Sequence, residues 1–124
     1  MISYEEFKKV EIRAGKIRSA EKVADNDKLL KLLVDFGEKE MIKIGAEGNT
    51  HPEPKPRQII SGIALHFPDP TVLVGKTCMF VTNLEPRTIR GFESNGMLFA
   101  VSGSDGTFSL LEPNNSIPPG SLAA

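Results

Sequence analysis

The chain has 124 residues, a net charge of −1 and a single cysteine. This length suits one hydrophobic core, because typical domains hold ~100–150 residues, so we predict one domain over residues 1–124. No apolar run approaches the ~20 residues that a membrane-spanning helix needs. The N-terminal stretch MISYEEFKKV carries acids where a signal peptide is basic, which predicts a cytoplasmic protein.

Residues typical of catalysis or metal binding do not cluster in the sequence. Cys78 has no second cysteine to share a metal, and its apolar setting TCMFV predicts a buried strand residue. His51 and His66 stand apart in loop-like stretches without metal-ligand spacing. Neither a glycine-rich nucleotide fingerprint nor a His–acid–nucleophile set is present. We therefore predict a protein that is not an enzyme and needs no metal or cofactor.

The N-terminal quarter of the chain is basic although the chain as a whole is not. Residues 7–31 hold eight basic and four acidic side chains, a local charge of +4 that leaves −5 for the remainder. Just ahead, Ser3 and Glu6 have capping-box spacing, which predicts a helical turn ending near Lys9. The positive stretch fits either a polyanion-binding face or a solvated mixed-charge surface, and charge counting alone favours the second.

A curved strand is predicted over residues 10–18. Val10 and Ile12 alternate with charged residues, and the apolar parity changes after Gly15. A one-residue bulge at Gly15 would restore the apolar face and bend the strand. It would also turn three basic side chains outward together, those of Arg13, Lys16 and Arg18.

A second strand follows the polar turn at residues 25–27, with one apolar face made by Leu30, Leu32, Val34 and Phe36. Further strands are expected at residues 40–46, 57–65, 76–83, 96–102 and 107–113, with one or two helical turns at 68–76 and a mobile proline-rich loop at 47–56. Gly62, inside one of these strands, predicts a bulge or a close backbone approach.

Short strands at these intervals predict an all-β fold. Five or more of them, with a short helix between the third and fourth, suit a small closed barrel of the oligonucleotide/oligosaccharide-binding (OB) type, with a short N-terminal helix and β additions at the C-terminus. An open sandwich is the alternative.

The segment LEPRTIRGFESNG, residues 84–96, has the chemistry of a phosphate-binding turn. Arg87 and Arg90 carry planar guanidinium groups that bind phosphate through two donors at once, and Gly91 lets the backbone approach a ligand closely. An interpretation of equal weight is that the two arginines pair locally with Glu85 and Glu93.

Six ordered blocks make the chain resemble a known family. They are FKKVEIRAGKI, DNDKLLKLLVDFG, RQIISGIA, LVGK, NLEPRTIRGFESNGMLFA and a closing LLEP…PPG. In order and spacing they are similar to the tRNA-binding domain family, which includes the C-terminal domain of bacterial methionyl-tRNA synthetase and its stand-alone dimeric relatives. The resemblance spans residues 7–120 and implies an OB fold, non-catalytic and largely sequence-independent tRNA binding, and a homodimer.

The resemblance assigns binding residues by position. The family element Asn-Leu-x-Pro-Arg-x-x-Arg-Gly falls on Asn83, Leu84, Pro86, Arg87, Arg90 and Gly91, the element Ser-x-Gly-Met on Ser94, Gly96 and Met97, and the element Asp-Lys-Leu on Asp27, Lys28 and Leu29. We therefore expect tRNA contacts from Arg87, Arg90, Asn83, Ser94, Met97 and Lys28, joined by the strand basics Arg13 and Lys16.

The sequence departs from the family pattern in two places. Relatives often carry lysine where this chain has Glu85 and Thr88, and residues 38–56 form a longer link than usual. The expected partners are tRNA, a second copy of the chain and an aminoacyl-tRNA synthetase. A polypeptide-binding, export-chaperone-like dimer of the same fold is the alternative function, and an assembly subunit is a third.

Overall fold

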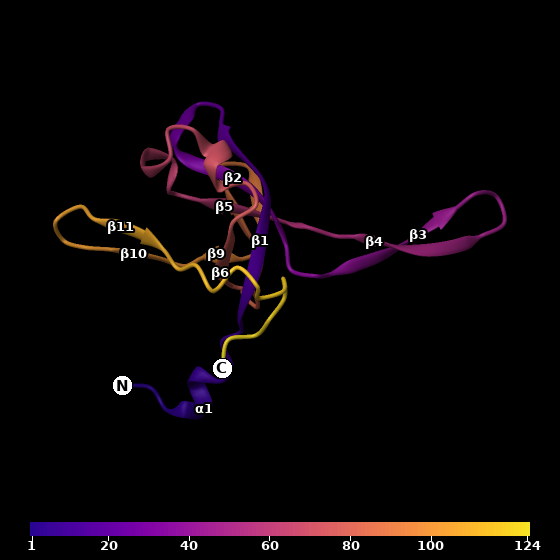
Figure 1. The fold of residues 1–124 in the computed structure, drawn as a ribbon, viewed down its shortest axis with the longest axis horizontal. Coiled ribbons are helices and arrows are strands. Elements are labelled where there is room, and N and C mark those ends of the chain that lie inside the picture. Colours follow the sequence, from indigo (N-terminus) through magenta and orange to yellow (C-terminus); the bar gives the residue numbers. More distant parts are fainter.

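A five-stranded antiparallel sheet forms the body of the protein in the computed structural model, which describes residues 1–124 (Figure 1). Its strands run in the order β5-β2-β1-β6-β9. Their bounds are Ile12–Val23 for β1, Asn26–Asp35 for β2, Arg57–Ser61 for β5, Thr77–Val81 for β6 and Met97–Leu98 for β9. The all-β prediction is confirmed, and no helix is long and apolar enough to cross a membrane.

Three two-stranded hairpins and three short helical segments complete the chain. The hairpins pair β3 (Lys39–Ile44) with β4 (Asn49–Pro54), β7 (Arg87–Ile89) with β8 (Phe92–Ser94), and β10 (Ala100–Ser102) with β11 (Phe108–Leu110). The helical segments are α1 (Tyr4–Phe7) and the 3-10 turns η1 (Ala64–His66) and η2 (Pro70–Leu73). The two 3-10 turns lie between β5 and β6, where a short helix was expected.

The N-terminal helix begins as its capping pattern predicts. The Ser3 hydroxyl accepts a hydrogen bond from the Glu6 backbone N–H at 3.1 Å and donates one to the Glu6 carboxylate at 3.3 Å. No residue of α1 is buried, so this local capping is the main support of the helix.

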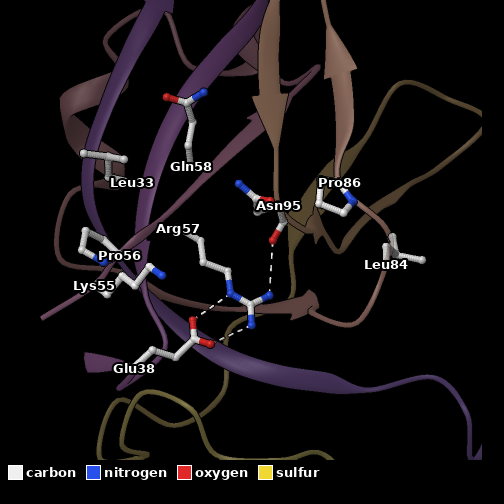
Figure 2. Close-up of a pocket in the computed structure, with 9 residues that line it drawn as sticks. All are labelled: Leu33, Glu38, Lys55, Pro56, Arg57, Gln58, Leu84, Pro86 and Asn95. Carbon is white, nitrogen blue, oxygen red and sulfur yellow. Dashed lines mark hydrogen bonds and ion pairs between the residues drawn. The ribbon is translucent and has the colours of Figure 1, made fainter. Parts of the chain in front are cut away.

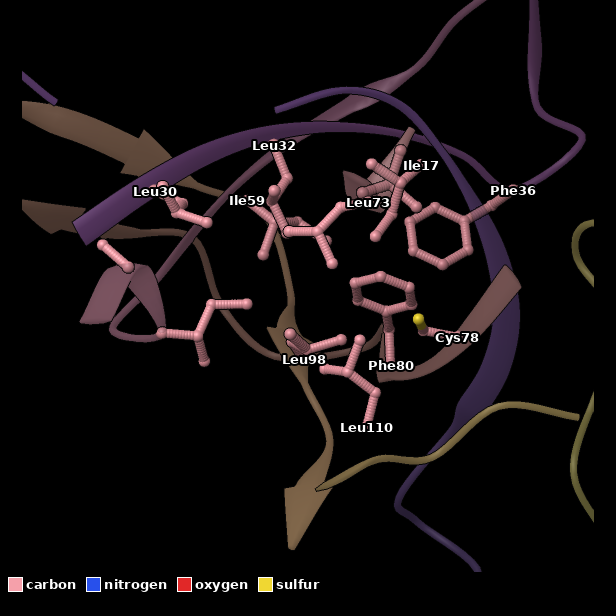
Figure 3. Packing of buried hydrophobic residues seen from close by; sticks show 13 residues of the cluster. Ile17, Leu30, Leu32, Phe36, Ile59, Leu73, Cys78, Phe80, Leu98 and Leu110 are labelled. Atoms are coloured by element: carbon pink, nitrogen blue, oxygen red, sulfur yellow. The ribbon is translucent and has the colours of Figure 1, made fainter. Parts of the chain in front are cut away.

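The core lies on the apolar face predicted for the second strand. Leu30, Leu32, Val34 and Phe36 are all buried, and with residues from every other strand of the sheet they form a cluster of 13 side chains (Figure 3). Cys78 lies inside the cluster, as its apolar setting predicts. Burial raises the pKa of its thiol to about 11.

The predicted bulge at Gly15 is wrong in position. Gly15 pairs in register with Cys78 of β6, and the register with β2 shifts between Ile17 and Ser19 instead. Gly15 serves a different purpose, because a Cβ placed on it would lie 2.5 Å from Phe36 Cε1. Sequence parity alone could not separate a bulge from a close approach of two strands.

The proline-rich loop predicted at residues 47–56 is also wrong, because β4 lies within it and pairs with all six residues of β3. The Lys55 N–H donates to the Glu38 carbonyl at 2.9 Å, which sets the phase of this hairpin. Residues at an odd number of positions from this pair direct their backbone N–H positions away from the partner strand, so Pro52 and Pro54 forfeit no hydrogen bond between the strands.

The two edges of the sheet approach each other at β5. The Asn95 N–H donates to the Gln58 carbonyl at 2.8 Å, and the Ile60 N–H donates to the Ser94 hydroxyl at 3.0 Å. No strand ladder joins β5 to β9, so a closed five-stranded barrel stays a prediction. The buried strand expected at residues 96–102 divides into β9 and the exposed β10.

Candidate functional site

The segment that carries the two predicted arginines folds into the β7–β8 hairpin. Its ladder ends at Ile89 opposite Phe92, which leaves Arg90 and Gly91 as a two-residue turn. Both have positive φ, 51° for Arg90 and 86° for Gly91. Two positive φ values are the requirement of a type I′ turn, in which Asn-Gly is the favoured pair and arginine is unusual.

This hairpin lies across the outer surface of β5 and β2. The Gln58 side-chain amide donates to the Glu93 carbonyl at 2.9 Å, and the Lys31 ammonium lies 5.5 Å from the centre of the Phe92 ring. Together with the bond from Ile60 to Ser94, these contacts hold the β7–β8 hairpin along the edge of the sheet.

Arg87 and Arg90 are exposed and make no ion pair. Neither Glu85 nor Glu93 comes within 4.0 Å of a basic group, so the local network that the sequence allowed is absent. The two guanidinium groups, that of Arg87 on β7 and that of Arg90 in the turn, are thus free to meet an external anion.

A pocket of about 520 Å³ opens beside this hairpin (Figure 2). Its lining residues are Leu33, Glu38, Lys55, Pro56, Arg57, Gln58, Leu84, Pro86 and Asn95. Lys55 and Pro56 lie on one side of Arg57 and Leu84 and Pro86 on the other. The pocket therefore joins the base of the β3–β4 hairpin to the start of the 84–96 segment.

Arg57 organises this pocket. Its guanidinium donates to both oxygens of Glu38, at 2.7 and 2.8 Å, and to the backbone carbonyls of Thr82 at 2.6 Å and Asn95 at 3.4 Å. The hydrogen bonds from Arg57 hold the pKa of Glu38 below its usual value, and those to Glu38 raise the pKa of Arg57. A further contact places the guanidinium 5.3 Å from the centre of the Phe36 ring.

Two of the predicted contact residues, Asn83 and Ser94, use their polar side-chain groups in hydrogen bonds to the backbone of the protein itself. The Asn83 amide accepts from the Glu11 N–H at 2.8 Å and donates to the Lys9 carbonyl at 2.6 Å. The Ser94 hydroxyl accepts from Ile60 and donates to the Gly96 carbonyl at 3.1 Å, and Ser94 is buried. These side chains shape the segment, and Arg87 and Arg90 are the basic groups that it presents to solvent, beside the exposed Glu85 and Glu93.

The four remaining predicted contact residues are Met97, Lys28, Arg13 and Lys16. Met97 lies beside Arg87 in a small hollow, and Lys28 lies on β2 three residues from Lys31, roughly 10 Å along the strand. Arg13 and Lys16 lie on β1, the middle strand of the sheet and two strands from the edge that carries the hairpin.

Arg13 pairs with Glu11 and donates to the Gly120 carbonyl at 2.8 Å, and Arg18 pairs with Asp35 at 2.9 Å. The outward group of Arg13, Lys16 and Arg18 expected from a bulge at Gly15 therefore does not form as a free basic face.

Sequence reasoning missed Lys31, Lys55, Arg57, Gln58 and Asn95. Their role depends on the pairing of β5 with β2 and on the approach of residue 95 to residue 58, which no local motif announces. Asn95 alone carried a signal, because it lies inside the SNGM element. No group of three or more His, Cys, Asp or Glu side chains is placed to hold a metal ion.

Comparison with known proteins gives consistent matches over nearly the whole chain. Residues 12–122 match the family described as "Putative tRNA binding domain". The methionine–tRNA ligase of Methanospirillum hungatei JF-1 is 44% identical to this chain over 96% of the chain's length. The methionine–tRNA ligase of Methanoregula boonei is 45% identical over 97%. The chain spans only 15% of the length of each of these ligases.

Two solved structures are similar to this chain over its whole length. The MetRS related protein from Pyrococcus horikoshii superposes with a TM-score of 0.82 at 33% identity, covering 100% of this chain and 98% of that protein. Chaperone CsaA from Bacillus anthracis str. Ames superposes with a TM-score of 0.75 at 24% identity, covering 100% and 99% of the two chains. The second likeness concerns the fold alone.

Proposed function

Because the chain belongs to the tRNA-binding domain family, we propose that it is a non-catalytic module that docks tRNA electrostatically and largely without regard to nucleotide sequence. The OB barrel and a cytoplasmic role in protein biosynthesis are part of the proposal. The module would act alone or raise the effective concentration of tRNA at an aminoacyl-tRNA synthetase. Identity to methionine–tRNA ligases supports a synthetase as the partner.

The observation that carries the proposal is the conformation of Arg90. A residue with a side chain costs roughly 1–2 kcal/mol in the left-handed region, and Asn or Gly would relieve much of this cost. Arg90 nevertheless occupies that position, exposed and without an ion pair. Its guanidinium contributes nothing visible to the fold, so a ligand outside the protein is the natural partner.

The chemistry follows from the exposed groups. Arg87 and Arg90 supply forked donors that match phosphate oxygens, and the exposed Lys28 on β2 offers a point charge to a further phosphate. Base stacking is weak here, because the Phe92 ring lies against the Lys31 ammonium. Contacts to the RNA backbone therefore dominate, and binding should weaken steeply as salt rises.

Arg90→Asn separates a ligand role from a structural one. Asn favours the type I′ turn, so the free energy of unfolding should stay equal or rise. The tRNA affinity should fall, with the slope of log K against log salt becoming shallower by about 0.7–0.9, the value of one phosphate contact. The measurements are urea denaturation and filter binding of bulk tRNA across a salt series.

Lys76→Gln is the matched control, because Lys76 already pairs with Glu112 at 3.2 Å and lies away from the hairpin. It should leave the salt slope unchanged. Absence of tRNA binding by the wild-type chain at low salt would refute the proposal. Tight binding of an unfolded polypeptide in its place would favour the chaperone-like alternative.

The proposal includes a homodimer formed through α1 and the C-terminal residues. A helix of four residues is unstable alone, yet Tyr4 and Phe7 are 71% and 50% exposed and line a groove of about 350 Å³ with Leu122. A second copy would cover these apolar groups. Light scattering should give twice the chain mass for the wild type and the single-chain mass for Tyr4→Ser, Phe7→Ser.

A further inference from the structure

The β3–β4 hairpin, residues 39–54 and called the arm below, projects from the body of the protein (Figure 1). None of its residues is buried, and Met41 is 62% exposed. An isolated two-stranded hairpin is at best marginally stable in water. An arm that contributes nothing to the core has its use outside the body of the protein.

The register sorts the charges of the arm onto opposite faces. Residues directly opposite each other share a face, and faces alternate along each strand. One face carries Lys39, Met41, Lys43, Thr50, Pro52 and Pro54, and the other carries Glu40, Ile42, Ile44, Asn49, His51 and Glu53. The first face has two positive charges and no acid, and both of its lysines lack an ion pair. On the second face, His51 pairs with Glu53.

The outer edges of the arm differ as well. Because Glu38 and Lys55 form a hydrogen-bonded pair, the odd-numbered residues of β3 direct their N–H groups outward. The opposite edge lacks donors at Pro52 and Pro54. The edge of β3 thus combines free backbone donors with Lys39 and Lys43, and both kinds of group bind phosphate oxygens.

The arm is continuous with the candidate site. Arg57 holds Glu38 at the root of the arm and also donates to the carbonyl of Asn95, another residue of the pocket (Figure 2). It donates to the carbonyl of Thr82 as well. Lys55, which has no ion pair, lines the same pocket on the side of Arg57 that lies away from Leu84 and Pro86. A polyanion that reaches Arg87 can therefore continue over Lys55 to the basic face of the arm.

We propose that the arm is a second RNA-contacting element, whose Lys39–Lys43 face and β3 edge bind the phosphate backbone of the same tRNA that Arg87 and Arg90 hold. This inference rests on the proposed function, since it extends the same binding site. Charge complementarity selects the Lys39–Lys43 face, because the opposite face bears Glu40 and Glu53 and would repel phosphate.

The test is Lys39→Gln, Lys43→Gln in the full chain, with bulk tRNA and a salt series. Loss of two phosphate contacts should make the slope of log K against log salt shallower by about 1.4–1.8. The factor by which tRNA affinity falls between about 50 and 200 mM salt should therefore be roughly tenfold smaller than for the wild type. Lys39→Arg, Lys43→Arg should keep the wild-type slope. Glu40→Gln, Glu53→Gln, the matched change on the opposite face, should also keep it.

A second variant removes the arm. Glu38 and Lys55 are already bonded across its root, so an Asn-Gly turn can replace residues 39–54. The urea midpoint should stay close to that of the wild type, because the arm buries nothing, and the salt slope should match that of the double glutamine variant.

The outcomes separate the two proposals. If the wild-type chain binds no tRNA, the proposed function fails. If it binds and both arm variants keep the wild-type slope, the arm inference fails alone. Capture of an extended peptide on the β3 edge, lost on arm removal while tRNA binding is unchanged, would also overturn the inference.

Discussion

Replacing Gly15 with alanine tests how the interior of the sheet is packed. A Cβ at this position would lie 2.5 Å from Phe36 Cε1 and 2.6 Å from Val34 Cγ1. Carbon atoms in contact stay about 3.5–4.0 Å apart, so the added methyl group overlaps two core atoms by roughly 1 Å each. One of the two side chains has to move.

The Phe36 ring has little room to move. Its neighbour Phe80 packs edge-on at 5.2 Å between ring centres, and the Arg57 guanidinium covers it at 5.3 Å. Overpacking of this kind costs about 1–3 kcal/mol, against which alanine gains about 0.4–1 kcal/mol from the unfolded chain. The free energy of unfolding should fall by about 1–2 kcal/mol.

Urea denaturation measures this directly, and the expected loss corresponds to a midpoint lower by roughly 1 M. Gly62→Ala is the matched control, because no atom lies within 4 Å of the added Cβ and its φ is not in the left-handed region. It should be neutral or slightly stabilising. The sequence prediction of a bulge or close approach at Gly62 is thereby wrong, since β5 ends at Ser61.

The double-mutant cycle with Phe36→Leu identifies the clash. In that background Gly15→Ala should cost less, because the overlapping ring atoms are gone. An unchanged midpoint for Gly15→Ala would refute the reasoning. It would mean that the Phe36 ring and the Val34 side chain yield to the added methyl group without a measurable cost.

Three further measurements probe single contacts. The Cys78 thiol should resist a thiol reagent at pH 8 until the protein unfolds, since burial raises its pKa to about 11. Glu38→Gln should lower the urea midpoint at pH 7, and the difference from wild type should shrink as the pH falls below 4.5, because the depressed pKa of Glu38 stabilises the fold only while the carboxylate is charged. Ser94→Ala should cost about 1–3 kcal/mol by leaving the buried Ile60 N–H without an acceptor, and should speed hydrogen exchange of that amide.

The strands with one buried face could be predicted from the sequence. Leu30, Leu32 and Val34 are buried and alternate with the half-buried Lys31, Leu33 and Asp35, because only one side of β2 meets the core. Cys78 was placed correctly for the same reason. Burial imposes a period of two, and that period is visible in the sequence.

The strand expected at residues 40–46 corresponds to β3, and β4 escaped prediction because neither face of the arm is buried. No apolar period marks β4, and its prolines are typical of loops. Pro52 and Pro54 fit a strand only when their positions fall outside the hydrogen-bonded pairs. That phase is set by the pairing of Glu38 with Lys55, 17 positions apart in the chain, and composition does not report it.

The candidate site, like the fold, could be predicted only in part from the sequence. Arg87 and Arg90 were found from a local motif, and the structure leaves both exposed. Asn83 and Ser94 were expected to contact the ligand, yet their polar groups bind backbone atoms 72 and 34 positions away. A motif records that a residue type is needed at a position, and only the fold distinguishes a side chain that shapes the site from one that displays charge.

The ion pairs support the mixed-charge interpretation that charge counting favoured for residues 7–31. Four of the eight basic residues in the 7–31 stretch, Lys8, Arg13, Arg18 and Lys31, pair with carboxylates of the protein. Beyond residue 31 the sequence is acidic in sum, yet Lys39, Lys43, Lys55, Arg87 and Arg90 have no ion pair and lie on the arm, the pocket and the β7–β8 hairpin.

A bound polyanion senses charges within about 8–10 Å at physiological salt, so these unpaired groups determine its attraction more than the net charge of −1 does. Most of the salt dependence of tRNA binding should accordingly come from residues beyond position 31, although that part of the sequence carries a net negative charge. Lys8→Gln, Arg18→Gln would leave the salt slope unchanged under this view. A shallower slope for that variant would return the basic face to the N-terminal stretch.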